Sequence, residues 1–86
     1  MIESQIDMEA FREKMISLKS LFFDDTTERV QAILQEKGQK IFSASHIRKV
    51  RSGRIYVRDI VAALLQVAKE NKKVYDAQMN EINNLL

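Results

Sequence analysis

The chain has no cysteine and no proline, and among its 86 residues there are two glycines and one histidine. Without cysteine it can form neither a disulfide framework nor a thiolate metal site, so we expect a reducing, cytoplasmic environment. So few helix breakers favour long helices over hairpins or sandwiches. No apolar run approaches the ~20 residues that span a bilayer, and residues 1–12 lack the apolar core of a signal peptide. These absences predict one small helical domain over residues 1–86, with no membrane segment.

The residue patterns of catalysis and of metal or cofactor binding are also missing. His46 has no acidic residue near it in sequence to orient it as a general base. There is no glycine-rich phosphate loop, nucleophile elbow or metal-ligand spacing. The adjacent carboxylates Asp24 and Asp25 precede a helix and are typical of a cap. We therefore expect no enzyme, no small-molecule substrate, no cofactor and no metal.

Apolar residues at steps of three and four predict the first two helices. The first is expected to begin at Asp7 as N-cap and to end near Phe22, with its stripe formed by Met8, Phe11, Met15, Leu18 and Phe22. The second should begin at Asp25, paired with Glu28 in a capping box, and end at Gly38 in the left-handed conformation. Its buried side is predicted to comprise Val30, Ile33, Leu34 and the stem of Lys37.

A connector and two further helices are predicted after Gly38. Ile41 and Phe42 are expected to tuck under a short third helix that Ser43 or Ser45 caps and Gly53 ends. Its apolar positions are Ala44, Ile47 and Val50. A fourth helix should run from about residue 57 to at least residue 73. The following tail could be its continuation, a separate fifth helix or a dimerisation arm. The expected fold is an all-α domain of four to five helices.

Positive charge is concentrated in one segment of this chain. Residues 37–58 contain seven basic residues and no acidic one, although the whole chain has 14 basic and 12 acidic residues. A solvated helix face ordinarily mixes both signs, as residues 12–14 and 69–70 do here. This segregation points to a polyanionic partner.

The third predicted helix combines this charge with an apolar stripe that would hold it in place. At about nine residues it could not persist alone, so Ile47 and Val50 must dock it and leave its cationic side exposed. The major groove of DNA admits a helix whose Arg and Lys reach guanine. The expected DNA-binding residues, including flanking phosphate contacts, are Lys40, Ser45, His46, Arg48, Lys49, Arg51, Arg54 and Arg58.

The spacing around this helix resembles the helix-turn-helix of phage-repressor-like DNA-binding regulators. The resemblance spans about residues 26–71, with the motif at 26–54 and a packing helix from about 57. It rests on the run Ser43-x-Ser45-x-Ile47-x-x-Val50-x-x-Gly53-Arg54, followed by Ile60, Leu64 and Ala68. It implies sequence-specific DNA binding in transcription regulation, with Ser45, His46, Arg48 and Lys49 facing the groove. The turn is about three residues longer than usual, because nine positions separate Gly38 from Ile47.

Small DNA-binding modules commonly dimerise on two half-sites. We expect a homodimer through the C-terminal helical region, with Leu64, Val67, Val74, Met79 and Ile82 as the candidate surface. The alternative hypothesis is a helical protein–protein interaction module that binds an acidic or helical partner. RNA binding is a weaker third hypothesis, because single-strand recognition generally needs several stacking aromatic rings and the candidate next to the basic patch is Tyr56.

Overall fold

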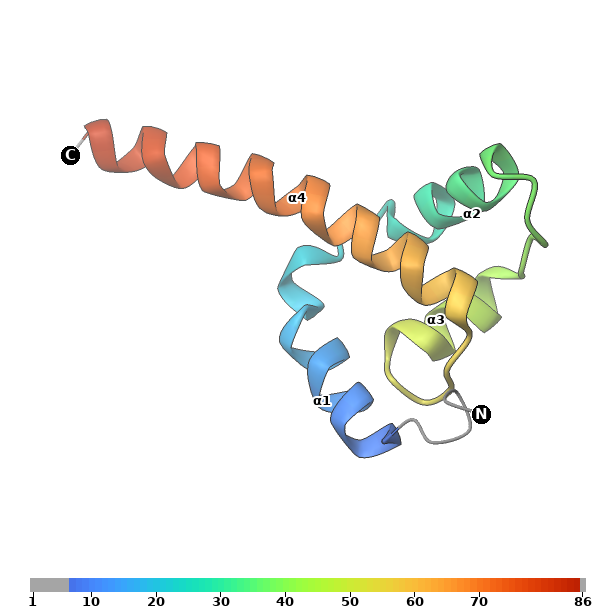
Figure 1. Cartoon of the computed structure of the whole chain (residues 1–86). Helices are drawn as coiled ribbons and strands as arrows, with labels where there is room; N and C mark the ends of the chain where they lie inside the picture. Colours follow the sequence, from blue (N-terminus) through green and yellow to red (C-terminus); the bar gives the residue numbers. More distant parts are fainter. Residues whose placement is uncertain (1–6, 86) are drawn as a thin grey trace.

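The computed structural model describes residues 7–85, which contain four α-helices, one 3-10 helix and no strand (Figure 1). The elements in order are α1 (Met8–Ser17), η2 (Lys19–Leu21), α2 (Thr26–Glu36), α3 (Ala44–Arg51) and α4 (Arg58–Leu85). The predicted all-α class is confirmed. Across these described residues, no helix combines the length and the hydrophobicity that a membrane span requires.

The N-terminal helical segment is divided into two elements. Asp7 caps α1 as predicted, because its Oδ1 accepts hydrogen bonds from the backbone N–H groups of Glu9 and Ala10 at 3.0 and 3.2 Å. The prediction of one helix to Phe22 is wrong, since α1 ends at Ser17 and η2 follows. At Leu18 the N–H contacts the carbonyls three and four residues back, at 3.2 and 3.1 Å, and the chain then tightens into the 3-10 turn.

The second helix begins where predicted, but not by the predicted means. Asp25 occupies the N-cap position with φ −87° and ψ 7°, and its side chain makes no capping hydrogen bond. A capping side chain needs an extended N-cap backbone, so the capping box is wrong. Gly38 ends the helix at φ 69°, and the Gln39 N–H bonds the Leu34 carbonyl at 2.9 Å, as in a Schellman motif. Lys37, whose stem was expected on the buried side, is an exposed residue.

The connector and the short third helix follow most of the expected pattern. Ser43 caps α3 through its Oγ, which accepts from the His46 N–H at 3.2 Å, and this decides between the two candidate serines. Phe42 is half-buried against the core, but Ile41 is 52% exposed and does not tuck under α3. Gly53 follows α3 at φ 83°, and the Arg54 N–H closes a second Schellman motif on the Lys49 carbonyl at 3.0 Å.

One apolar core holds α2, α3 and the first half of α4 together, with α1 and η2 covering one side (Figure 1). Its buried apolar members are Met15, Phe22, Val30, Leu34, Ile47, Val50, Ile60, Ala63, Leu64, Val67 and Ala68. Because α4 contributes the most of these side chains, it serves as the packing surface for the other helices.

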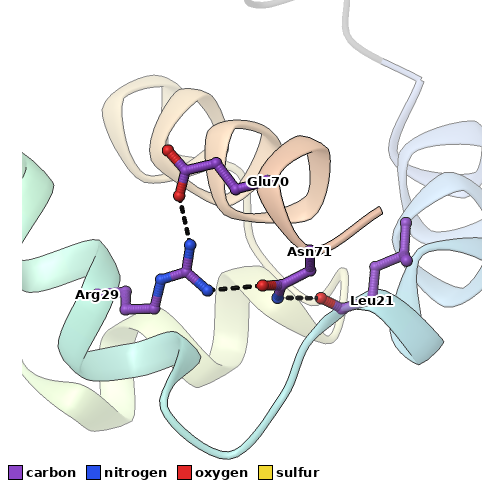
Figure 2. Close-up of polar contacts among 4 residues, drawn as sticks. All are labelled: Leu21, Arg29, Glu70 and Asn71. Carbon is purple, nitrogen blue, oxygen red and sulfur yellow. Dashed lines mark hydrogen bonds and ion pairs between the residues drawn. The ribbon is translucent and has the colours of Figure 1, made fainter. Parts of the chain in front are cut away.

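A group of polar contacts joins α4 to α2 and η2 (Figure 2). Asn71 of α4 is buried, accepts a hydrogen bond from Arg29 Nη1 at 2.6 Å and donates one from Nδ2 to the Leu21 carbonyl at 2.7 Å. Arg29 also pairs with Glu70. The side chain of Asn71 therefore fastens α4 to both α2 and η2, with its amide oxygen and nitrogen both satisfied.

The tail is the continuation of α4, so the possibility of a separate fifth helix is wrong. The helix extends well past the other elements (Figure 1), and the side chains of residues 72–85 are all exposed. The radius of gyration is 14.6 Å. A compact domain of this length would have one of about 12 Å. The projecting half of α4 accounts for the difference.

Candidate nucleic-acid interface

The buried side of α3 fixes how its polar side is presented. Ile47 and Val50 are both 0% exposed and pack in the core shared with α2 and α4. The Ser43 cap fixes the first turn, and the motif around Gly53 fixes the last. A short helix held at both ends and along one side presents its remaining side chains in a defined arrangement.

Three of the predicted groove-facing residues lie on this exposed side. Ser45, Arg48 and Lys49 are exposed, and together with Ser52 and Arg54 they line one shallow surface hollow. Arg54 was predicted to lie just past the helix, and the structure brings it back beside α3. The residues nearest this hollow are thus three cations and two hydroxyls.

Two other predicted site residues are partly covered. The His46 ring lies 5.0 Å from the Phe42 ring, with the ring planes 33° apart. Arg51 donates a 3.4 Å hydrogen bond to the Phe22 carbonyl, and its guanidinium lies 5.7 Å from the centre of the Phe22 ring. Arg51 therefore helps to hold α3 against the segment after η2, and it offers less of its surface to a ligand than Arg48 does.

The flanking cations lie on the elements before and after α3. Lys40 is exposed in the connector, and its Nζ lies 5.1 Å from the centre of the Phe42 ring. Arg58 is the first residue of α4, where its side chain is 72% exposed and its Nε is 3.9 Å from Asp59. Lys40 and His46 thus share one aromatic neighbour, whereas Arg58 has a carboxylate beside it.

Within residues 7–85, the cations of α3 are not neutralised by carboxylates of the same chain. The ion pairs there are Arg29–Glu70, Arg58–Asp59 and Lys72–Asp76. None of them involves Arg48, Lys49, Arg51 or Arg54. Among the described residues, Arg48, Lys49 and Arg54 therefore carry exposed positive charge without a carboxylate partner.

The structure adds two cations that the sequence did not indicate. Lys19 of η2 lines a second hollow, between α1 and α3, with Arg48 and Arg51. Arg12 of α1 lies against the end of α3, since a Cβ built on Gly53 would be 2.7 Å from the Arg12 Cα. Both lie in a segment far from α3 in sequence, and no local pattern marks them as neighbours of α3.

The predicted dimer surface needs a correction. Leu64 and Val67 are 0% exposed and belong to the core, because they lie on the side of α4 that α2 and α3 cover. Val74, Met79 and Ile82 lie on the projecting half of α4 and are exposed.

The connection between α2 and α3 covers residues 37–43. It is longer than the turn of about three or four residues in a helix-turn-helix.

In the part of the chain that the structure describes, no three His, Asp or Glu side chains are grouped to hold a metal ion. Comparisons with protein-family models, with curated proteins and with solved structures find no match for this chain.

Proposed function

We propose that this protein binds double-stranded DNA sequence-specifically and acts as a transcriptional regulator, without catalysis. The observation that carries the proposal is the exposed face of α3, where Ser45, Arg48 and Lys49 project from a helix docked by two fully buried aliphatic side chains. The major groove admits a structure with the width of a helix. Arg48 and Lys49 carry N–H groups that can donate hydrogen bonds to guanine O6 and N7. The resemblance to phage-repressor-like regulators supports the same assignment.

In this proposal the cations divide into two groups by position. Arg48, Lys49 and Ser45 enter the major groove and contact base edges, which supplies specificity. Arg54, Lys40 and Arg58 flank α3 and contact phosphates, which supplies affinity and register. The long connection at residues 37–43 makes the approach of α3 to the groove differ from that of the tight-turn motif.

The test is an unbiased selection from a duplex library at two salt concentrations. We expect an enriched sequence motif and an affinity that falls steeply with salt. The variant Arg48→Ala with Lys49→Ala should lose binding while its far-ultraviolet circular dichroism stays helical, because both side chains are exposed. The matched control Lys73→Glu makes the same change of two charge units at one exposed position outside α3, and it should bind as the parent chain does.

Two results would overturn the proposal. One is a chain that enriches no duplex at either salt concentration, which would favour the interaction-module hypothesis. The other is equal binding by the α3 double variant and its control, which would show that net charge and not the face of α3 attracts the DNA.

A further inference from the structure

The projecting half of α4 presents an uncovered apolar stripe. Tyr75 and Ile82 are each 49% exposed and Met79 is 39% exposed. Most of the stability of a protein helix comes from tertiary packing of its apolar face, and residues 73–85 of α4 are all exposed. A helix of this length with this stripe is stabilised when a partner buries it.

The stripe has the spacing of a coiled coil and extends into the body of the molecule. Tyr75, Met79 and Ile82 are separated by four and then three residues. The same alternation continues backward along α4 through Lys72, Ala68, Leu65 and Val61. A repeat of 3.5 residues keeps one seam of a helix facing a partner helix along its whole length.

Within the body this seam forms one wall of an apolar groove, opposite α1 and η2. The apolar lining comprises Phe11, Met15, Leu18, Leu21, Val61, Leu65 and Ala68. The charged residues that line it are Lys14, Lys69 and Lys72, all basic. The projecting segment, residues 74–85, carries Asp76 and Glu81 and no Lys or Arg. The groove and the tail are therefore both apolar along the seam. Beside the seam, the groove carries positive charge and the tail carries negative charge.

We propose that this groove binds the α4 tail of a second copy of the chain, in an antiparallel and reciprocal pair. With the two-fold axis between Lys72 and Tyr75, Leu65 lies opposite the second copy's Ile82, and Ala68 lies opposite its Met79. Lys69 then faces the second copy's Asp76. Such an isologous contact fills both grooves at once. A parallel, in-register pair would leave both grooves empty and place Lys72 against Lys72. The inference stands independently of DNA binding.

Sedimentation equilibrium without DNA tests the pairing. We expect the chain to have twice the 10.0 kDa mass of one copy. Met79→Asp should weaken association at least about tenfold, because it buries a carboxylate in the seam. Ala77→Asp makes the same charge change at an exposed position away from the seam, and it should remain a dimer. A monomeric parent chain, or equal behaviour of two folded variants, would overturn the proposal.

Cysteine cross-linking tests the direction of the pair in a chain that has no native cysteine. Leu65→Cys combined with Ile82→Cys should give a covalent dimer on mild oxidation. The two positions are about 25 Å apart along one helix, too far for a disulfide within a chain, which needs Cα atoms closer than about 7 Å. Each single variant should stay unlinked. Efficient linking by Ile82→Cys alone would indicate a parallel pair and contradict the proposal.

Discussion

The two glycines of this chain have similar backbone conformations and different surroundings. Gly38 has φ 69°, and a Cβ added there would meet open space, with no neighbouring side chain or backbone within 4 Å. At Gly53, with φ 83°, an added Cβ would lie 2.7 Å from the Arg12 Cα. The left-handed conformation costs a residue with a Cβ about 1–2 kcal/mol. At Gly53 a clash with the backbone of α1 adds to that cost.

We therefore expect Gly53→Ala to lower the free energy of unfolding more than Gly38→Ala does. Gly38→Ala should lower it by about 1–2 kcal/mol, since only backbone strain changes. Thermal unfolding followed by circular dichroism would measure both variants against the parent chain. Equal losses would show that α1 does not lie against the end of α3.

The residue scale also shows which features a sequence can predict. Asp7 and Gly38 were placed correctly because a cap and a left-handed glycine depend on residues only a few positions away. Ile41 and Leu64 were misplaced because exposure depends on which distant element covers a side chain. An apolar residue alone does not reveal whether it faces a core, a partner or water.

At the scale of elements, the docking of α3 depends on its two buried aliphatic side chains. We expect Ile47→Ala to lower the free energy of unfolding by about 2–5 kcal/mol, because Ile47 is 0% exposed and truncation leaves a cavity. Ile41→Ala is the matched control, the same substitution at a 52% exposed position, and it should change stability by less than about 0.5 kcal/mol. Urea denaturation would compare the variants. A neutral Ile47→Ala would mean that α3 is not packed as described.

The arrangement of elements was only partly predictable. The helical steps in the sequence placed α2, α3 and α4, because amphipathic periodicity is a local signal. The tie from Arg29 to Asn71 was not found, since it joins residues 42 positions apart and neither residue stands out in its own helix. For the same reason the approach of Lys19 to Arg48 and Arg51 was missed. The cationic face of α3 was found because all of its residues are adjacent in sequence.

At the scale of the whole molecule, the proposed DNA-binding surface and the proposed dimer surface differ in the sign of their charge. The α3 face and its flanks are basic, whereas residues 74–85 at the end of α4 carry Asp76 and Glu81 and no Lys or Arg. In the proposed complex each acidic tail binds the groove of the second copy, and the basic faces of α3 remain exposed to bind DNA. The salt dependence of DNA affinity measured on the dimer should then report the phosphate contacts of the basic face.

This separation predicts different effects for the two kinds of DNA contact. Arg54→Gln removes one proposed phosphate contact, so it should weaken binding to all duplexes similarly and reduce the slope of log K against log salt by about 0.9. Arg48→Ala removes a proposed base contact and should relax the selected motif at one position, a loss of about 1–3 kcal/mol of discrimination. Fluorescence anisotropy titrations at several salt concentrations, on the selected duplex and on a scrambled one, would measure both.

The control for these titrations is Lys73→Gln, which removes one charge from an exposed position on α4. It should leave both the slope and the motif unchanged, because Lys73 lies outside the α3 face. If Lys73→Gln altered the slope as much as Arg54→Gln, the salt dependence would reflect the net charge of the protein. If Arg54→Gln changed the motif and left the slope intact, Arg54 would read bases, and the division between flanking and groove contacts would be wrong. The proposal requires that the effect of each substitution depend on where the cation lies relative to α3, and not on its charge alone.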